Sequence, residues 1–464
     1  MLQLGDGFYD AVQAVRFPQA ELRFRNQRWA QRVGLGHLST TEWAAHFARF
    51  EPLPDNLPQP LALRYHGYQF RVYNPALGDG RGFLFAQLYE DDPAGSGGGR
   101  LLDLGTKGSG QTPWSRGGDG RLTLKGGVRE VLATEMLEAL GVPTSKSFSL
   151  FETGEELVRG DEPSPTRSSV LVRLGHSHVR FGSFERHARA QDRTRLEKLM
   201  SYAVEHHFPE LSGTSELPVR FFGAVAKRTA ALAARWMAAG FVHGVLNTDN
   251  MNVTGESFDY GPYRFLPSYD PGFVAAYFDE TGLYRFGRQP DTLRWNLERF
   301  ADALSPLCPR ERLAAELIDY EPRYMQAHHA AFHERLGLRP LDPIADSLFV
   351  SHCLCFLQES KMPFDRFFFD WYGGALSEKR ARQGTAAEHY RGERWALIER
   401  EMREREPSHA ERLELPYFQR PEPVTLVIDE IESIWTAIAE HDDWSPFEAK
   451  IAAIRDLRTT LEPI

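Results

Sequence analysis

The sequence changes from strand-like to helical patterning after about residue 185, and this change limits the fold more than any other feature. Between about residues 62 and 174, short apolar runs are separated by turn residues, a pattern that indicates strands. One helix interrupts this region at 127–140, where apolar residues recur at four-residue spacing. Helical spacing dominates later, as at 219–239 and 390–406. The order of elements predicts an α+β fold with a cleft between a strand-rich lobe and a helical lobe.

The expected strands share β-branched, aromatic and leucine residues bounded by glycine or proline. They lie within LALRYHGYQF (61–70), GFLFAQLY (82–89), RLLDLGTKG (100–108), SFSLF (147–151) and SSVLVRL (168–174). Turn residues in NPALGDGRG (74–82) separate two of them, and DDPAGSGGG (91–99) is a low-complexity stretch that we interpret as an insertion.

Three regions follow from this pattern. Residues 1–60 are predicted to be a helical extension, because helical spacing occurs at 22–33 and 41–50 before a proline-rich break. Residues 61–182 are predicted to form the strand-rich lobe. Residues 183–464 are predicted to form the helical lobe together with a C-terminal extension.

Charge and apolar content exclude several classes of partner. The net charge of −10 argues against nucleic acid and anionic membrane, since both require a basic face. No apolar run approaches the roughly 18 residues of a membrane span. The first residues, MLQLGDGFYDAVQ, have no positive region before an apolar one, so no targeting segment is expected.

The three cysteines favour a cytoplasmic protein. Cys308, Cys353 and Cys355 are too few for a disulfide framework, and such usage suits a reducing compartment. Cys353 and Cys355 lie in an apolar stretch and could form a redox or metal pair. We interpret them as buried structural thiols, because free cysteine is among the most buried residue types.

Chemistry-bearing residues first gather in LDLGTKGSGQTPWSRGGDGR (102–121). Lys107 ends an expected strand, and a glycine-rich loop follows it. Glycines let backbone N–H groups approach phosphate oxygens, and a lysine adds a point charge. The spacing is that of neither a Walker loop nor a dinucleotide fingerprint, so a flexible turn with a solvated lysine stays open.

Two further segments offer partners for this loop. The helix at 127–140 carries Glu130, Glu135 and Glu138, one of which could pair with Lys107 as an ion pair does in protein kinases. The segment LVRLGHSHVRFGSF (171–184) carries Arg173 and Arg180, which could converge on a phosphate. Taken alone, each of these side chains could equally be a solvated surface group.

The segment FVHGVLNTDNMNVTGESFDYGPY (241–263) carries the most information. It places Asp249, Asn250 and Asp259 within eleven residues, and oxygen ligands suit a hard divalent cation. In kinases an H-R-D-x-x-x-x-N loop precedes D-F-G, and the Asn and second Asp bind metal. Here His243 and Asn250 keep that interval, and Asp259 begins D-Y-G.

One position breaks the kinase pattern. Val245 stands where kinases carry the catalytic aspartate, so the usual base is missing from its usual position. Asp249, beside Asn250, is left as a candidate proton acceptor. Asn and Asp also favour turns for local reasons, so a purely structural Asx-rich turn is the alternative.

Four runs of sequence together carry a resemblance to a known family: GDGRG (78–82), TKGSGQTPWSRGGDGRLTLKGGVREVLATEML (106–137), VRLGHSHVRFGSFE (172–185) and HGVLNTDNMNVTGESFDYGPYRFL (243–266). They closely resemble the selenoprotein O family, kinase-like proteins once classed as pseudokinases. The resemblance covers about residues 60–300. It implies a two-lobed protein-kinase-like fold and transfer of AMP from ATP to Ser, Thr or Tyr hydroxyls of proteins.

The resemblance also implies roles for individual residues. Lys107 matches the phosphate-binding lysine, Glu130 its helix partner, and Asp249 the proposed base. Asn250 and Asp259 match ligands of Mg²⁺ or Mn²⁺. The nucleotide contacts are matched by Gly78, Gly80, Arg81, Asp119 and Gly120, and the terminal-phosphate contacts by Arg173 and Arg180. ATP is expected to lie flipped relative to kinases, with its α-phosphate presented, so Val245 is expected of the family.

Some features depart from the family or leave the reaction open. Tyr68 and Arg71 stand where family members carry His and Gly, and LRTTLEPI at the C-terminus has neither cysteine nor selenocysteine. Three alternatives remain. They are a conventional kinase, against which Val245 argues, a uridylyltransferase using UTP with Mn²⁺, and a non-catalytic nucleotide-binding scaffold.

Overall fold

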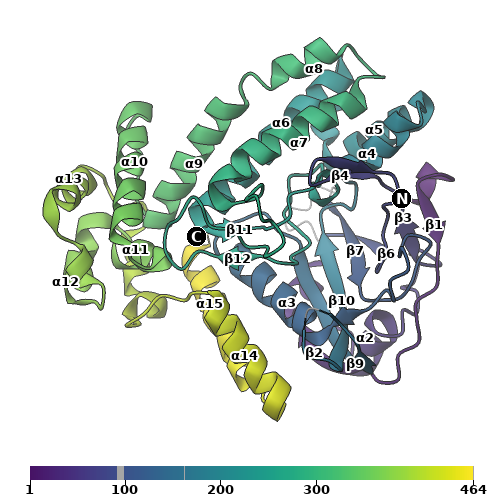
Figure 1. Ribbon diagram of the computed structural model, residues 1–464, viewed down its shortest axis with the longest axis horizontal. Helices are drawn as coiled ribbons and strands as arrows, with labels where there is room; N and C mark the ends of the chain where they lie inside the picture. Colours follow the sequence, from purple (N-terminus) through teal and green to yellow (C-terminus); the bar gives the residue numbers. More distant parts are fainter. Residues whose placement is uncertain (91–98, 161, 463–464) are drawn as a thin grey trace.

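An antiparallel sheet with helices packed against it occupies one part of the molecule, and helices make up most of the rest (Figure 1). The computed structural model describes residues 1–90, 99–160 and 162–462. The mixed α+β composition and the passage from strands to helices therefore agree with the sequence-based prediction.

Among the described residues, eight strands form the main sheet, in the order β1-β3-β6-β7-β10-β9-β2, with β8 pairing β10. All of its pairings are antiparallel. The strands are β1 (Tyr9–Ala11), β2 (Glu21–Arg25), β3 (Leu61–Leu63), β6 (Leu84–Tyr89), β7 (Leu101–Lys107), β8 (Leu122–Thr123), β9 (Lys146–Leu157) and β10 (Thr166–Gly175). The smaller pairs are β4 (Gly67–Gln69) with β5 (Val72–Asn74), and β11 (Phe241–Val242) with β12 (Arg264–Phe265).

Helix α3 (Leu124–Ala139) packs against β9 and β10 and corresponds to the helix expected at 127–140. The Thr123 side chain accepts a hydrogen bond from the Gly126 N–H and caps the first turn. Val128, Leu132 and Met136 are fully buried, as their four-residue spacing requires. The position of α3 against the sheet is thus fixed by apolar packing.

A long series of helices follows the last strand of the main sheet in the sequence. They are α4 (Phe181–Arg189), α5 (Arg193–His207), α6 (Leu217–Ala239), α7 (Gln289–Leu304), α8 (Arg310–Glu316), α9 (Tyr320–Leu336), α10 (Pro343–Ser360), α11 (Phe364–Asp370), α12 (Glu378–Gln383), α13 (Gly392–Arg403), α14 (Ile428–His441) and α15 (Ser445–Leu461). Helix α6 packs against both α7 and α9 and forms the centre of this part. The helices expected at 219–239 and 390–406 are confirmed as α6 and α13.

The N-terminal region differs from its prediction. Helix α2 (Thr40–Phe47) confirms the helix expected at 41–50, but the one expected at 22–33 is only α1 (Gln27–Arg32). Strands β1 and β2 belong to the main sheet, so residues 1–60 are not purely helical. These strands are short, and their register comes from pairing with β3 and β9, which local spacing does not reveal.

The cysteines also differ in part from their prediction. All three are free, and Cys353 is buried, but Cys355 is exposed. Both lie on α10, and residues two apart on a helix face different directions.

The low-complexity stretch at 91–99 lies outside the described residues except for Gly99. Within the described part of the chain, no helix is long and apolar enough to cross a membrane.

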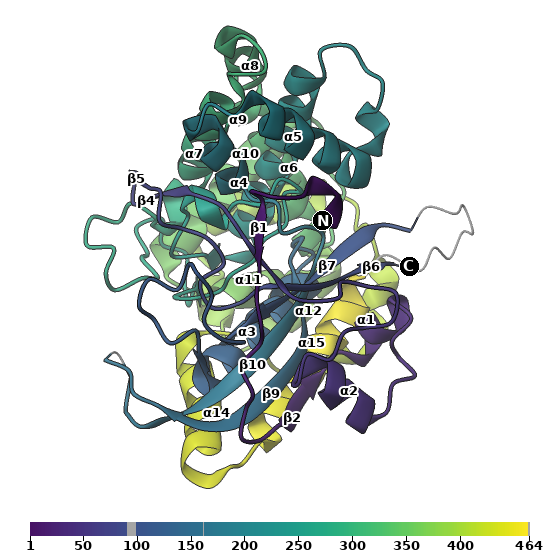
Figure 2. The same ribbon diagram turned by 90° about the vertical axis from the view of Figure 1, so that its right-hand side faces the viewer.

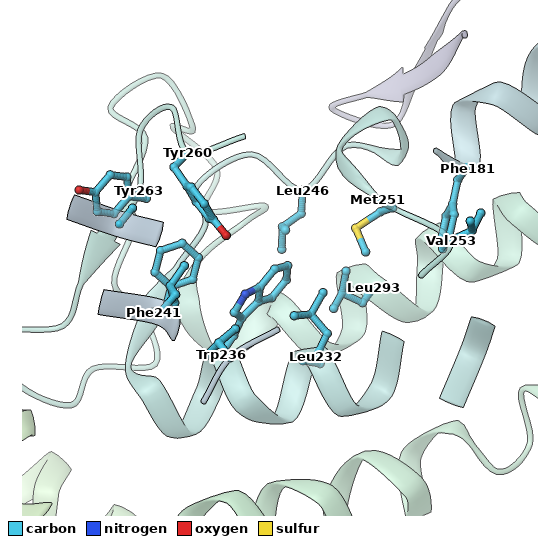
Figure 3. Packing of buried hydrophobic residues seen from close by; sticks show 14 of the residues in the cluster. Phe181, Leu232, Trp236, Phe241, Leu246, Met251, Val253, Tyr260, Tyr263 and Leu293 are labelled. Carbon is cyan, nitrogen blue, oxygen red and sulfur yellow. The ribbon is translucent and has the colours of Figure 1, made fainter. Parts of the chain in front are cut away.

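A hydrophobic cluster supports the polar segment at 241–263 from below (Figure 3). Trp236 of α6 and Leu293 of α7 are buried beneath it. Apolar residues of the segment belong to this cluster and are interspersed among its polar residues. They are Phe241, Leu246, Met251, Val253, Tyr260 and Tyr263. The backbone of an otherwise irregular segment is therefore held by apolar burial at both ends and in the middle.

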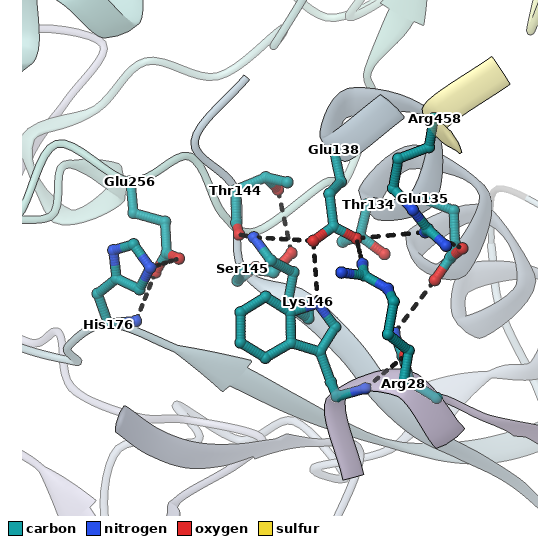
Figure 4. Close-up of polar contacts among 12 residues, drawn as sticks. Arg28, Thr134, Glu135, Glu138, Thr144, Ser145, Lys146, His176, Glu256 and Arg458 are labelled. Carbon is teal, nitrogen blue, oxygen red and sulfur yellow. Dashed lines mark hydrogen bonds and ion pairs between the residues drawn. The ribbon is translucent and has the colours of Figure 1, made fainter. Parts of the chain in front are cut away.

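The C-terminal helix α15 returns to the sheet and packs against α3 through ion pairs (Figure 4). Arg458 Nη1 lies 3.4 Å from Glu135 Oε2 and 3.6 Å from Glu138 Oε2. Arg455 Nε lies 3.4 Å from the same Glu135 oxygen. Glu138 also pairs with Arg28 of α1. Two largely buried carboxylates of α3 thus depend on cations more than 300 residues away and on the N-terminal region.

We predict that Arg458→Met lowers the free energy of unfolding by about 3 kcal/mol, because two largely buried carboxylates lose a shared cation. Arg455→Met is the matched control: its side chain is 41% exposed, against 9% for Arg458, at the same distance from Glu135. The control should cost less than about 1 kcal/mol. Urea unfolding measures both, and equal losses would contradict the assignment of the effect to burial.

Candidate functional site

A cavity of about 650 Å³ collects nearly all of the predicted site residues. Those that line it are Gly78, Gly80, Arg81, Lys107, Asp119, Gly120, Arg173, Arg180, Asp249, Asn250 and Asp259. Glu130 is the exception, and it reaches the cavity only through its contact with Lys107. Val245 also lines the wall, so no carboxylate stands at the position where kinases carry their base.

Lys107 joins three elements at the bottom of the cavity. It is the last residue of β7, and its ammonium forms ion pairs with Glu130 of α3 and with Asp259, whose Oδ1 is 2.5 Å away. The side chains of Lys107 and Glu130 are 5% and 1% exposed. The pairing expected between Lys107 and Glu130 is therefore present, and it is a buried one. Contact of Lys107 with phosphate stays a prediction.

Asp259 receives positive charge from more than one direction. Arg173 Nη1 lies 3.6 Å from Asp259 Oδ1, and the Nη1 and Nε atoms of Arg173 have no hydrogen-bond partner in the described part of the chain. Burial alone would raise the pKa of Asp259, but the ammonium of Lys107 and the guanidinium of Arg173 outweigh it and hold that pKa well below its usual range. Asp259 therefore remains a carboxylate, as a cation ligand must.

Arg180 is fixed on four sides. Its Nη2 lies 3.2 Å from Asp79 Oδ1, and its Nη1 donates to the Asp249 carbonyl at 3.0 Å. The guanidinium also lies over the rings of Tyr65 and Phe258, at 4.4 and 4.9 Å from their centroids. The side chain is thus pre-oriented, while none of the residues that the structure describes gives its Nε a hydrogen-bond partner.

Asp249 and Asn250 share the short helical turn Thr248–Asn250. Asp249 is buried, and no hydrogen-bond partner for its Oδ1 is present among residues 1–90, 99–160 and 162–462. Burial raises the pKa of Asp249 to about 6, although the guanidinium of Arg180 opposes this. Asn250 Nδ2 donates to the Val245 carbonyl at 3.0 Å, so its oxygen is the side-chain atom available to a cation.

The β4–β5 hairpin supports this turn from the other side. The Tyr68 N–H donates to Thr248 Oγ1 at 2.8 Å, and Thr248 Oγ1 donates to Glu185 Oε2 at 2.9 Å. Burial raises the pKa of Glu185 to about 8. A Cβ at Gly67 would lie 2.7 Å from Asp249 Oδ1, so the hairpin backbone lies directly against the carboxylate. A side chain at position 67 would therefore require Asp249 or the hairpin to shift.

The residues fit a divalent cation bound together with a polyphosphate. Asn250 and Asp259 offer oxygen atoms, which suit Mg²⁺ or Mn²⁺. Among residues 1–90, 99–160 and 162–462, no cluster of three or more His, Cys, Asp or Glu side chains could hold a metal unaided. A nucleotide-bound cation takes only one or two protein ligands, so two suffice here.

Several lining residues escaped the sequence analysis. Asp79 orients Arg180 and accepts the Leu63 N–H, yet it sits unremarked inside the GDGR turn. Trp114 packs against Gly78, where a Cβ would lie 2.3 Å from its ring, so that glycine is required for packing as well as for backbone access. Arg159, in the β9–β10 connection, pairs with Asp119 at 2.8 Å. Only spatial proximity reveals Arg159, because it lies 40 residues from Asp119.

A cavity lined by both cations and carboxylates is typical of enzymes that act on polyphosphates. Comparison with known proteins gives the family. Residues 1–455 match the model of protein adenylyltransferase SelO. The protein nucleotidyltransferase YdiU of Synechocystis sp. is 44% identical over 461 residues, covering 96% of this chain and 94% of the relative. That of Gloeobacter violaceus is 44% identical over 465 residues, covering 97% and 93%.

This chain therefore belongs to the protein adenylyltransferase SelO family, and it is a nucleotidyltransferase. The resemblance noted at about residues 60–300 is confirmed. The match extends across the N-terminal region and most of the C-terminal helices, for which sequence patterns provide no identification.

We predict that Gly67→Ala lowers the rate of nucleotidyl transfer by about 10²-fold, because the new Cβ displaces Asp249 or the hairpin by about 1 Å. Gly160→Ala is the control, since a Cβ there meets nothing within 4 Å. Steady-state transfer assays compare the two variants. Wild-type activity in Gly67→Ala would show that the carboxylate position is unimportant.

Proposed function

We propose that this enzyme transfers AMP from ATP to Ser, Thr or Tyr hydroxyls of proteins and releases pyrophosphate. The observation that carries the proposal is the buried Asp249 carboxylate, which shares one cavity with Lys107, Arg173 and Arg180. Its Oδ1 has no hydrogen-bond partner among the described residues. The absence of a carboxylate at Val245 supports attack on a phosphate other than the one kinases transfer.

In this proposal the cationic wall holds the leaving group. Lys107, Arg173 and Arg180 neutralise the β- and γ-phosphates, while Arg81 and the backbone near Gly78, Gly80, Asp119 and Gly120 contact the rest of the nucleotide. Asn250 and Asp259 would hold Mg²⁺ or Mn²⁺, which when bound neutralises charge on phosphate oxygens. Preorganised charge of this kind carries most of the catalysis in phosphoryl-type transfer.

Asp249 accepts the proton of the attacking hydroxyl. A bond forms between the acceptor oxygen and the α-phosphorus, and the bond from the α-phosphorus to the β-bridging oxygen breaks. Pyrophosphate leaves with the electron pair of that bond. The residues that hold the β- and γ-phosphates therefore act on the leaving group, consistent with a nucleotide that lies flipped relative to kinases.

We further propose that the fold is a two-lobed kinase-like one. The sheet with α3, within residues 61–182, would be the nucleotide-binding lobe, joined by strands β1 and β2 of the N-terminal region. Residues 183–464 would be the helical lobe, with α14 and α15 reaching back to α3. The net charge of −10 and three free cysteines support a cytoplasmic enzyme acting on proteins, without nucleic-acid or membrane partners.

Transfer of UMP from UTP with Mn²⁺ is the second candidate, because the relatives carry the broader name protein nucleotidyltransferase. A non-catalytic nucleotide-binding scaffold is the other alternative that the sequence patterns leave open. Membership of a transferase family argues against it.

We predict that label from α-³²P ATP appears on protein and that label from γ-³²P ATP leaves as pyrophosphate. Unlabelled UTP in excess should reduce α-label transfer little if ATP is the preferred donor. Labelling from the γ-position alone would mean a kinase and would overturn the proposal. Preferential use of α-³²P UTP would favour the second candidate.

We predict that Asp249→Asn keeps nucleotide affinity within a few-fold and lowers the transfer rate by about 10²–10⁴, because a general base is lost. The matched variant Asp259→Asn should instead weaken metal-dependent nucleotide binding, since the cation loses a charged ligand. Calorimetric titration with ATP and Mg²⁺ or Mn²⁺ measures affinity, and label transfer measures rate. Identical behaviour of the two variants would contradict their separate roles.

A further inference from the structure

An exposed apolar surface lies at the tip of the β4–β5 hairpin, which projects at the left of Figure 2. Its members are Phe70 and Val72 of the hairpin and Tyr277 and Phe278 of a neighbouring loop, and we call it the hairpin platform. Tyr277 is 82% exposed and Val72 69%. The Phe70 and Phe278 ring centroids are 6.0 Å apart, and those of Tyr277 and Phe278 are 5.1 Å apart.

The hairpin platform is continuous with the cavity. Gln69, the last residue of β4, lines the cavity beside Asp249. The next residue, Phe70, donates its N–H to Asn247 Oδ1 and to the Tyr284 hydroxyl, both at 3.1 Å. The Tyr284 hydroxyl donates to the same Asn247 oxygen at 2.7 Å. One hydrogen-bonded unit therefore carries both the platform and the turn that presents Asp249.

The hairpin turn is built from unusual residues. Gln69 pairs with Val72, which leaves a two-residue connection of Phe70 and Arg71 with φ values of 49° and 65°. Such turns favour Asn-Gly, because bulky side chains are disfavoured at positive φ. Strain of this kind persists at functional sites, where it presents side chains that a relaxed turn would not.

Arg71 adds a free positive charge to this tip. Its side chain is exposed, and its guanidinium lies over Trp295, 5.3 Å from the ring centroid. In the described part of the chain, no carboxylate comes within 4.0 Å of it. An arginine held by an aromatic ring but lacking an ionic partner is suited to pair with a carboxylate on another molecule.

We propose that the hairpin platform binds the segment of the protein substrate that flanks the acceptor hydroxyl. An apolar or aromatic side chain of the substrate packs on Phe70, Tyr277 and Phe278, and an acidic side chain pairs with Arg71. The inference rests on the proposed function: Gln69 of this hairpin lines the same cavity as Asp249, so residues that flank a hydroxyl bound at Asp249 come within reach of the hairpin tip. Aromatic residues and arginine are also the residue types that anchor protein interfaces.

The test uses the full-length enzyme with synthetic peptides that carry a central Ser, Thr or Tyr. One set has Glu and Phe near the acceptor, a second has Lys and Phe, and a third has Glu and Ser. The wild-type enzyme should transfer α-label to the first set with a kcat/KM about tenfold above either of the others, a factor that one charge-assisted contact or one buried aromatic side chain can supply. Arg71→Glu should abolish or reverse the preference for Glu over Lys.

Two controls separate docking from folding and from the chemistry. Arg71→Gly should lose the charge preference without loss of stability, because glycine tolerates the positive φ of this turn. Arg391→Glu makes the same charge change at an exposed residue of the helical part and should keep the wild-type preference. ATP affinity should stay unchanged in all three variants.

The outcomes distinguish this inference from the proposed function. Absence of α-label on every peptide and protein, including the enzyme itself, would overturn the proposed function and this inference with it. Labelled protein with no preference among the peptides, or a charge preference that survives Arg71→Glu, would overturn the docking site alone. If the dependence of the transfer rate on substrate concentration changed together with dimerisation of the enzyme, the occupant of the hairpin platform would be a second copy of this chain. That result would also overturn the docking site.

Discussion

A buried ammonium ion is the constraint on which the rest of this structure depends. The charge of Lys107 is removed from water, and such a group is stable only where carboxylates surround it. Glu130 and Asp259 meet this need from two different elements, so strand β7, helix α3 and the segment after β11 converge on one point. The cavity lies where they converge, so its position follows from the pairing of the Lys107 charge with these carboxylates.

The polar segment at 241–263 must also be held in place, because it presents the side chain of Asp249. Residues 247–250 form no long regular element, and their side chains must stay oriented without a helix or sheet to hold them. Apolar residues on either side bury against α6 and α7, while Thr248 and Asn247 bind the β4–β5 hairpin. Packing therefore fixes the backbone. Within the described ranges Asp249 Oδ1 has no hydrogen-bond partner, so this oxygen is available for chemistry.

Much of this arrangement could be predicted from the sequence, because its signals are local. Four-residue apolar spacing identified α3, and dense glycine and Asx residues marked the segments that line the cavity. The kinase-like interval from His243 to Asn250, with Val245 between them, indicated the candidate metal ligands, and the family resemblance supplied the roles of the other site residues. What escaped depends on distant partners: β1 and β2 exist through pairing, and Asp79 matters because Arg180 reaches it. The exposure of Cys355 was also missed, because Cys353 and Cys355 lie on opposite faces of one helix and only Cys353 is buried.

The contact between α15 and α3 has a consequence for the order in which the molecule matures during synthesis. Arg458 follows Glu135 by 323 residues, and a ribosome adding about 5–20 residues per second needs roughly 16–65 s to cover that distance. Throughout that interval the nascent α3 carries two carboxylates without their C-terminal cations. The helix that holds Glu130 therefore reaches its final electrostatic environment only late in translation. A growing chain can already contain every residue of the cavity while its α3 still lacks the ion pairs with α15.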